Sequence, residues 1–481
     1  MGKERKAVFL CGEVRMQVST VMFQSLNHEF RIDAEYYREE VLNKLNVLDK
    51  HNKDDLENLV DFIIGPFGST VTVDQYVDNS NYKYIRNKDI NDFLIKDSDP
   101  ALIPKDIYDS LPKYHIREND LLITVVGTLG KVAIATKADI KSIFSCKSTI
   151  IRTRNINPFY LLTYLNTNTG KLFSLRGKRG AIQEGLNLPD LKEIQVFIPS
   201  PEFQKFIETT IRKSFVSTEK STELFEKAQT LLLSELSLAK WQPKHQLTFI
   251  KYFSDTEQAE RIDAEYFQPK YEAIIKAIKA YKGGWETLGD IVTVKKSVEV
   301  GSGEYLDKGI PFIRVSNISP FEITEEKYIS EKLYAEISQH QPKRGEILFS
   351  KDGTPGIAYY LDSKPRKMIP SGGILRLKRK SSKINNEYLT LILNSVLVKE
   401  QINRDVGGSI ILHWRPDQVK ETVIPILAEK KQNEIQAKVI ESLSLRKQSK
   451  HLLECAKRAV EIAIEQNEQA AIEWLKDQIE D

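Results

Sequence analysis

The chain is built on an internal repeat. The stretch RIDAEYY begins at Arg31 and RIDAEYF begins at Arg261, an offset of 261 − 31 = 230 residues. Further landmarks follow in the same order in both copies: Tyr84-Ile85-Arg86 and Phe312-Ile313-Arg314, the glycine turns at Gly127 and Gly353, Tyr160 and Tyr388, and the Pro-Asp pairs at Pro189 and Pro416. Such order predicts one module used twice, and most single-domain folds are thereby excluded.

Each copy mixes helical and strand patterns. A short helix is expected to open at each RIDAEY stretch, with Asp33 and Asp263 as its caps. Short strands bounded by glycine and proline are expected at 121–126, 149–154, 347–350 and 374–378, and helical patches at 160–166 and 388–394. The expected fold class is α+β, with two tandem similar domains.

A long helix is expected after each module. Residues 201–236 contain no glycine and no proline after Pro201, and apolar residues recur at helical spacing, among them Phe203, Ile207 and Ile211. The same change follows Pro425. At 1.5 Å per residue, the first helix would span roughly 54 Å. Each helix could pack on its own module, but two such seams in one chain favour an intramolecular coiled coil.

These patterns divide the chain into six parts. They are an N-terminal arm (1–30), a first module (31–200), a long helix (201–240), a linker (241–260), a second module (261–426), and a second long helix with an acidic end (427–481).

The charge is distributed unevenly. Lys plus Arg number 70 and Asp plus Glu number 67, so the formal net charge is only +3. However, residues 131–180 hold ten basic residues and one acid, a local charge of +9, and residues 357–408 hold ten basic residues and four acids, a charge of +6. Two basic segments at the same place in two copies suit a long polyanion such as double-stranded DNA.

Two groups of residues in each module are candidates for DNA contact. The first lies on a strand and the loops beside it, where basic and apolar residues alternate with period two. Its members are Lys147, Arg152 and Arg154 in the first module, and Arg376, Lys378 and Lys380 in the second. The second lies before the Pro-Asp pair: Arg176, Lys178, Arg179 and Gln183, and in the second module Arg404, Ser409, His413 and Arg415. Lysines would hold phosphates, whereas Arg and Gln can bond base edges. Each residue could equally be a solvated surface charge.

No enzyme signature is complete. The three cysteines form no CxxC pair, no HExxH is present, and a Walker motif at Gly130-Lys131 fails at Val125 and Val132. Pro416-Asp417 followed by Glu429-x-Lys431 has the spacing of a metal-dependent nuclease core, but the first copy has no matching Glu-x-Lys. We therefore assign no catalytic and no metal-binding residue, and we expect no membrane span.

The quoted motifs also resemble a known family. RIDAEYF, GPFGS at Gly65, GIPFIRVSNI at Gly309 and GEILFSKDGTPG at Gly345, with both Pro-Asp endings before long helices, are similar to the specificity subunit of type I restriction-modification systems. The resemblance implies two target-recognition domains that each read half of a split DNA site. It also implies an antiparallel pair of helices that sets the spacer and docks modification subunits.

The resemblance further implies that catalysis belongs to partners. These would be adenine-N6 methyltransferase subunits, two of them expected, that use S-adenosylmethionine, and a restriction subunit that uses ATP and Mg. The chain itself would bind no cofactor and would act in the cytoplasm in phage defence. Two alternatives remain: a DNA nuclease with a metal site near Asp417 and Glu429, and a coiled-coil protein scaffold.

Overall fold

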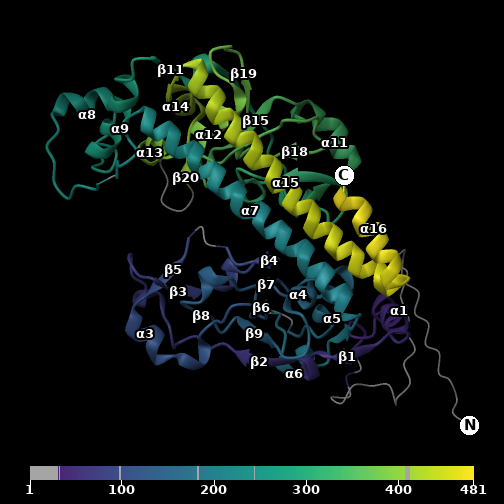
Figure 1. The fold of residues 1–481 in the computed structure, drawn as a ribbon. Coiled ribbons are helices and arrows are strands. Elements are labelled where there is room, and N and C mark those ends of the chain that lie inside the picture. Colours follow the sequence, from purple (N-terminus) through teal and green to yellow (C-terminus); the bar gives the residue numbers. More distant parts are fainter. Residues whose placement is uncertain are drawn as a thin grey trace, which may run out of the picture. The chain divides into compact units, whose positions relative to one another are not determined.

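The protein is described by a computed structural model covering residues 31, 33–96, 99–180, 184–242, 244–406 and 412–480. It divides into two compact units, Met1–Phe215 with Ser449–Asp481, and Val216–Gln448. Each unit holds one copy of the repeat, and the division falls inside both long helices (Figure 1). The predicted N-terminal arm, residues 1–30, lies outside the described residues.

Within its described residues, the strands of the first unit form three sheets. The largest has the order β2-β9-β6-β7-β4, formed by Val60–Ile64, Ser148–Thr153, Leu121–Thr124, Val132–Ile134 and Phe93–Leu94. A second has the order β5-β3-β8, formed by Ala101–Ile103, Tyr82–Ile85 and Ser142–Phe144. The third pairs β1 (Lys53–Asp55) with β10 (Gln195–Phe197).

The second unit repeats this plan. Its main sheet has the order β12-β19-β15-β17, formed by Val292–Lys296, Ile374–Arg379, Glu346–Ser350 and Ala358–Tyr360. The sheet β14-β13-β18 comprises Tyr328–Ile329, Ile310–Ile313 and Ile369–Pro370, and β11 (Trp285–Thr287) pairs with β21 (Val423–Pro425). The three-stranded sheet of each unit contains one parallel pairing, β3 with β8 in the first unit and β13 with β18 in the second. The predicted duplicated α+β module is confirmed.

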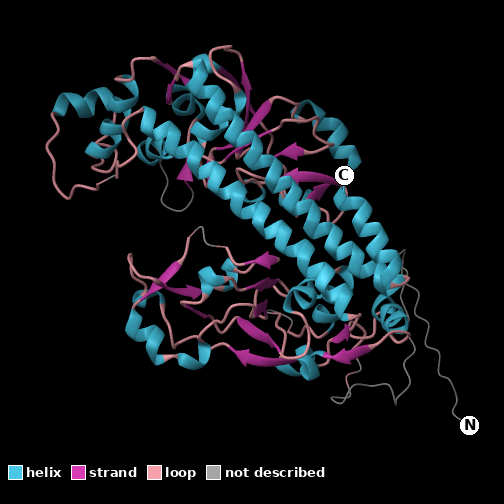
Figure 2. Ribbon diagram, in the orientation of Figure 1, coloured by secondary structure: helices cyan, strands magenta, loops and turns pink. Residues whose placement is uncertain are grey.

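Helices pack around these sheets (Figure 2). In the first unit they are α1 (Glu39–Leu48), α2 (Leu56–Leu59), α3 (Lys105–Ser110), α4 (Pro158–Asn166), α5 (Asn168–Arg176) and α6 (Leu188–Lys192). In the second they are α8 (Phe253–Ala259), α9 (Pro269–Lys279), α10 (Leu288–Ile291), α11 (Glu331–Ile337), α12 (Asn386–Leu393), α13 (Val396–Asp405) and α14 (Pro416–Glu421). The helical patches expected at 160–166 and 388–394 correspond to α4 and α12.

The helix expected to open at RIDAEY begins later than predicted. Asp33 Oδ1 does accept the N–H of Tyr36 at 3.1 Å, but it caps a single turn, and α1 begins at Glu39. The second copy behaves alike and α9 begins at Pro269. The reason there is steric, because a proline disfavours helical backbone at the residue before it, and Gln268 has ψ 129°.

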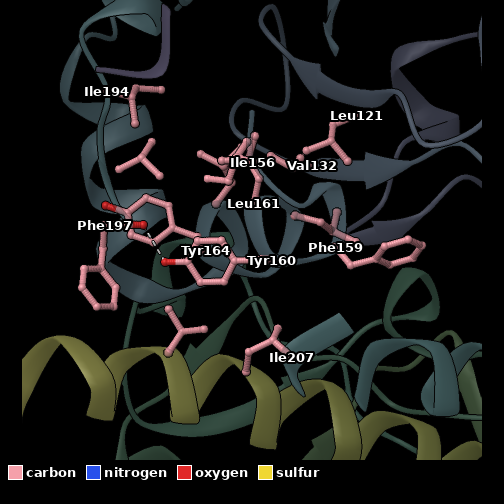
Figure 3. Close-up of a cluster of buried hydrophobic side chains, with 14 of the residues drawn as sticks. Leu121, Val132, Ile156, Phe159, Tyr160, Leu161, Tyr164, Ile194, Phe197 and Ile207 are labelled. Atoms are coloured by element: carbon pink, nitrogen blue, oxygen red, sulfur yellow. Dashed lines mark hydrogen bonds between the residues drawn. The ribbon is translucent and has the colours of Figure 1, made fainter. Parts of the chain in front are cut away.

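The repeated tyrosines tie α4 and α12 into the cores. Tyr160 and Leu161 are fully buried, and the Tyr160 hydroxyl donates to the carbonyl of Phe197 at 2.7 Å (Figure 3). Tyr388 in the second unit donates to the carbonyl of Pro425 at 3.0 Å. Each hydroxyl satisfies a buried carbonyl that would otherwise be unpaired. These landmarks of the repeat are therefore architectural.

The two long helices, α7 (Pro201–Glu235) and α15 (Glu429–Glu465), pair within each unit. In the first unit the hydroxyls of Ser214 and Ser449 lie 2.8 Å apart, and in the second those of Ser221 and Ser442 lie 3.0 Å apart. Also in the second, Lys431 contacts Glu235 at 2.9 Å. Rising numbers on α7 meet falling numbers on α15, so the pair is antiparallel. A final helix, α16 (Glu468–Glu480), packs in the first unit.

An asparagine docks each long helix onto its module. Asn157 caps α4, and its N–H donates to Gln204 at 3.0 Å while its Nδ2 donates to Glu208 at 2.8 Å. In the second unit Asn385 donates in the same way, to Gln432 at 3.2 Å and to Gln436 at 3.4 Å. The contact is the same in both units, except that the acceptor is the carboxylate of Glu208 in the first and the amide oxygen of Gln436 in the second.

Glu208 makes this contact sensitive to acid. Burial acts to raise its pKa, but hydrogen bonds from Arg212, Asn157 and Lys205 prevail and lower the pKa to about 2. In the unfolded chain the pKa is about 4.3. The stabilising contribution is therefore present above about pH 4.3 and is lost as the pH falls towards 2.

We predict that Glu208→Gln lowers the free energy of unfolding at pH 7 by about 1 kcal/mol, because a charged acceptor is lost. The variant should also lose stability less steeply than the parent between about pH 4.3 and pH 2. Denaturant midpoints measured across this range give both quantities. Glu219→Gln, at an exposed position of α7, is the matched control. Identical pH profiles for parent and Glu208→Gln would contradict the assignment.

Candidate nucleic-acid interface

Three loops of the first module meet at one place. The N–H of Val125 donates to the carbonyl of Lys147 at 2.9 Å, and the N–H of Leu186 donates to the carbonyl of Val125 at 2.9 Å. The turn after β6 reverses through Gly127 and Gly130, whose φ angles of 84° and 71° suit glycine. The loop around Lys147, the glycine turn and the loop before the Pro-Asp pair therefore lie side by side. We call their described residues, 125–131, 145–147, 178–180 and 184–186, the loop cluster.

The second module has an equivalent cluster. The N–H of Lys351 donates to the carbonyl of Gly373 at 2.9 Å, and the N–H of Trp414 donates to the carbonyl of Lys351 at 2.9 Å. Here β16 (Asp352–Gly353), which is part of the glycine turn, pairs with β20 (Leu412–His413). Gly353 and Gly356 again have positive φ, 67° and 96°. The sequence did not mark the glycine turns as part of the interface, although their recurrence was visible.

The predicted DNA-contact residues differ in exposure. Exposed side chains are Lys147 and Arg154 in the first module, and Lys378, Lys380, His413 and Arg415 in the second. Partly buried ones are Arg152, Arg176, Lys178, Arg179 and Arg404, and Arg376 is buried. Gln183 and Ser409 lie outside the described residues.

Two of the strand arginines are internal. Arg152 forms a two-pronged ion pair with buried Asp120, both contacts being 2.7 Å, and this hydrogen bonding raises the pKa of Arg152. Arg376 is 6% exposed and donates to the backbone carbonyls of Gln341 at 3.0 Å and Gln339 at 3.4 Å.

The physical reason is that the main sheet of the second unit is covered on both faces. Leu375 and Leu377 of β19 belong to one hydrophobic cluster, whereas Ile374 of the same strand belongs to another. Residues 374–377 therefore meet protein on both faces, and only the end of the strand, Lys378 and Arg379, is exposed. Contrary to the sequence prediction, β19 does not present Arg376 to solvent.

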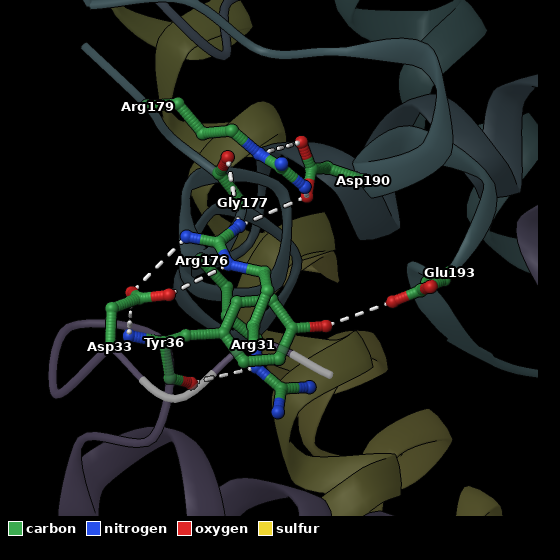
Figure 4. Close-up of polar contacts among 8 residues, drawn as sticks. All are labelled: Arg31, Asp33, Tyr36, Arg176, Gly177, Arg179, Asp190 and Glu193. Carbon is green, nitrogen blue, oxygen red and sulfur yellow. Dashed lines mark hydrogen bonds and ion pairs between the residues drawn. The ribbon is translucent and has the colours of Figure 1, made fainter. Parts of the chain in front are cut away.

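The RIDAEY motif fastens the start of the first module to the end of α5 (Figure 4). Arg31 bonds Asp33 through two nitrogens at 2.8 and 3.1 Å and lies 4.4 Å from the centre of the Tyr36 ring. The guanidinium of Arg176 stacks at 3.7 Å from that ring, and its Nε donates to the Tyr36 carbonyl at 2.9 Å. Burial lowers the pKa of Arg176 and raises that of Tyr36.

The second module contains the same Arg-Asp-Tyr contact, but Arg404 is farther from the tyrosine ring than Arg176 and its Nε donates to Asp405. Arg261 bonds Asp263 at 2.7 and 2.9 Å and lies 4.5 Å from the centre of the Tyr266 ring, with Arg404 at 5.5 Å from that ring. Cation–π contacts of this kind contribute roughly 0.5–2 kcal/mol. Arg176 and Arg404, predicted as DNA contacts, thus hold the module together. The signal for this role was the identity of RIDAEY in two otherwise diverged copies.

Arg179 is engaged by Asp190 of the first Pro-Asp pair. Its Nε and Nη2 donate to Asp190 at 3.1 and 2.8 Å, and Arg31 Nη1 donates to the same carboxylate at 3.0 Å (Figure 4). The Asp190 side chain is 1% exposed. Beside the equivalent place in the second module lies an open cleft of about 780 Å³ lined by Arg261, Arg404, Arg415 and Asp417, among others.

The residues of the suggested nuclease site take other contacts. Asp417 lies 3.5 Å from Arg415, and Lys431 contacts Glu235 and Glu434. Within the described part of the chain, no three His, Cys, Asp or Glu side chains gather as a metal site would require. Among those same residues, no helix has both the length and the apolar character needed to cross a bilayer.

The fold is thus a duplicated α+β module with two long helices that pair within each unit, and each module carries one loop cluster. Comparison of sequences gives the family: residues 64–221 and 282–454 both match the type I restriction modification DNA specificity domain. The chain therefore belongs to this family, and it contains the domain twice.

Individual relatives are more distant. The chain is 28% identical over 132 residues to the type I restriction enzyme EcoBI specificity subunit of Escherichia coli, a match that covers 27% of this chain and 28% of that protein. The match thus spans less than a third of the relative's length.

Among solved structures, the S subunit of a type I restriction-modification system from M. genitalium has 16% identity and a TM-score of 0.36, with 88% of this chain and 95% of that chain covered. The HsdS subunit from Thermoanaerobacter tengcongensis has 15% identity and a TM-score of 0.26, with 88% and 96% covered. Similarities this low add no weight to the family assignment.

We predict that Arg376→Ala destabilises the second unit rather than altering DNA recognition. Glu346, 2% exposed and 4.0 Å from Arg376, would lose its buried cation, at a cost of about 3 kcal/mol. Denaturant unfolding of the full chain measures this. Lys378→Ala, exposed on the same strand, should change stability by less than about 0.5 kcal/mol. Equal stability of the two variants would show that Arg376 is not a structural cation.

Proposed function

We propose that this chain is the non-catalytic DNA-specificity subunit of a type I restriction-modification complex, in which each module reads one half of a bipartite site. The observation that carries the proposal is the loop cluster, present once in each of two copies of the family's DNA specificity domain. Both clusters carry exposed basic side chains, as contact with DNA phosphates requires.

The exposed members of the predicted set, together with the partly exposed Lys178, form the proposed contact surface. At the loop clusters, Lys147 and Lys178 would hold phosphates, and His413 and Arg415 have side chains able to reach base edges. Arg154, Lys378 and Lys380 lie at the opposite ends of β9 and β19 and would add phosphate contacts beyond the clusters. Gln183 and Ser409 keep their proposed role as DNA contacts, with Gln183 able to bond base edges. Arg152, Arg176, Arg376 and Arg404 are removed from the set, because their guanidinium groups hold the modules together.

The proposed division of the chain follows the sequence: an arm (1–30), modules at 31–200 and 261–426, a linker (241–260), and helical segments at 201–240 and 427–481. The paired helices would fix the length of the unread spacer between the two half-sites. Their pairing is specific in register, because buried serines meet at Ser214–Ser449 and at Ser221–Ser442.

Methylation and cleavage would be carried out by partners in the cytoplasm. We propose two adenine-N6 methyltransferase subunits that use S-adenosylmethionine, and a restriction subunit that uses ATP and Mg. A need for protein partners is supported by the segment 247–262, which exposes Leu247, Ile250, Tyr252, Phe253 and Ile262 by 73–96%. Apolar side chains gathered in this way favour contact with another protein.

The proposal is tested by copurifying the chain with its modification subunit and measuring DNA binding and adenine methylation on a random-sequence library. A split recognition sequence with an unread spacer is expected. Methylation without sequence preference, or of one uninterrupted site, would contradict the two-module reading. DNA cleavage by the purified chain with Mg that Asp417→Ala abolishes would instead establish the nuclease alternative.

We predict that shortening both long helices by one heptad changes the spacer and not the half-sites. Deleting residues 215–221 together with residues 442–448 keeps the Ser214–Ser449 pair and the helical register. It removes about 10 Å of helix, the length of about three base pairs. Library methylation should show the same half-site sequences with a shorter spacer. An unchanged spacer would show that the helices do not set it.

We predict that Lys147→Ala removes one phosphate contact. The logarithm of the DNA association constant should depend less steeply on the logarithm of salt concentration, by about 0.9 in slope, with all DNA sequences weakened alike. Titrations at several salt concentrations measure this slope. Lys113→Ala, an exposed lysine outside the loop cluster, is the control. A loss confined to one DNA sequence would make Lys147 a base reader.

A further inference from the structure

Asp190 occupies a space that only a glycine at position 177 leaves open. Its carboxylate joins Arg31 and Arg179, and a Cβ atom placed on Gly177 would collide with the Cβ of Asp190. Arg31 also donates to the Gly177 carbonyl at 3.3 Å, so the backbone and the carboxylate are held by one guanidinium (Figure 4). We call this contact of Asp190 with Arg31 and Arg179 the latch.

The second module lacks the glycine. Arg404 occupies the position of Arg176, so Asp405 occupies that of Gly177, and the second Pro-Asp pair places Asp417 at the position of Asp190. Asp405, whose side chain is 8% exposed, accepts from Arg404 Nε at 2.7 Å. Asp417 is 71% exposed and lies 3.5 Å from Arg415. The equivalent carboxylate therefore stands in solvent.

The latch acts on the base of the first recognition loop. The N–H of Arg179 donates to the Gly185 carbonyl at 3.0 Å, and the N–H of Gly185 donates back at 2.8 Å. Lys178 and Glu184 add an ion pair of 2.9 Å across the same two strands of the loop. Because Asp190 holds the Arg179 side chain, it fixes the segment that enters the loop. The paired hydrogen bonds of Arg179 with Gly185 then fix the segment that leaves it.

The same contact changes the expected role of Arg179. A bidentate bond to guanine needs two adjacent donors of the guanidinium. Nε and Nη2, one such pair, are engaged by Asp190. In the structure, these two donors bind Asp190 and so hold the loop.

We propose that Asp190 is a positioning residue that holds the two ends of the first module's recognition loop, residues 178–180 and 184–185, in place before DNA binds. Among its described residues the second module, with Asp405 at the place of Gly177, has no such contact. The inference rests on the proposed function. Its consequence is an inequality between half-sites, because Asp190 holds the two ends of the first loop whereas the exposed Asp417 does not hold those of the second. Preorganisation lowers the cost of association.

The test compares equivalent carboxylates of one chain. Asp190→Asn and Asp417→Asn are each assembled with the modification subunit, and the preference for the correct base over the wrong base is measured at every position of both half-sites. We expect Asp190→Asn to weaken discrimination about tenfold at the first half-site, about 1.4 kcal/mol, and to leave the second unchanged. Asp417→Asn should change neither.

A double-mutant cycle separates positioning from reading. If Arg179 acts through Asp190, Arg179→Ala combined with Asp190→Asn should be no worse than either change alone. Gly177→Ala should reproduce the effect of Asp190→Asn, since the added Cβ displaces the carboxylate without removing it. If Asp190→Asn lowers the melting temperature, the Gly177→Ala variant still tests whether the position of the Asp190 carboxylate affects base discrimination.

Three results would overturn the inference. They are unchanged discrimination in both Asp190→Asn and Gly177→Ala, equal losses at both half-sites, and a loss at a single base pair in Arg179→Ala that Asp190→Asn does not share. If the complex with the parent chain shows no split-site preference, the proposed function fails as well. If the parent complex shows that preference and the Asp190→Asn complex behaves identically, only the latch is contradicted.

Discussion

Each long helix has an apolar stripe that must be buried, and the rest of the structure depends on this constraint. The core of the first unit contains Phe203, Ile207 and Ile211 from the start of α7, and also Ala456 and Val460 from the end of α15. Residues near the C-terminus thus complete a module that begins at Arg31. Neither helix can bury its apolar stripe without the other, so each copy of the repeat needs both long helices to complete its core.

This constraint explains which features the sequence could predict. The duplication, the strands and both long helices depend on local periodicity and on recurring landmarks, which a single chain displays. The burial of Arg376 could not be predicted in the same way. Period-two alternation shows that a strand has two faces, but it does not show whether a second layer covers the polar one. That layer includes Ile313 of β13, which lies far from β19 in sequence, and the carbonyls that hold Arg376 belong to Gln339 and Gln341.

The candidate site divides on the same principle. RIDAEY was visible as identical residues in two copies, yet its partners, Arg176 and Arg404, lie more than 130 residues later in each copy. A pairing so remote leaves no trace in spacing, and a guanidinium stacked on tyrosine looks in sequence like any other basic residue. The glycine turns were likewise recognisable as turns, but their place beside Lys147 and Trp414 is set by pairing between loops.

The charge of the basic segments changes meaning once their arginines are placed. The excess of basic residues at 131–180 and 357–408 includes Arg152, Arg176, Arg376 and Arg404. Their guanidinium groups contact carboxylates, backbone carbonyls and tyrosine rings within the modules. The exposed remainder consists largely of lysines, compact charges suited to phosphates rather than to paired bonds with bases. Affinity for DNA can therefore be spread over many lysines, whereas sequence preference must depend on the few side chains of the recognition loops and on how firmly each loop is held. On this view the exchange of Gly177 for Asp405 between the copies matters more for specificity than the difference in local charge between the two modules.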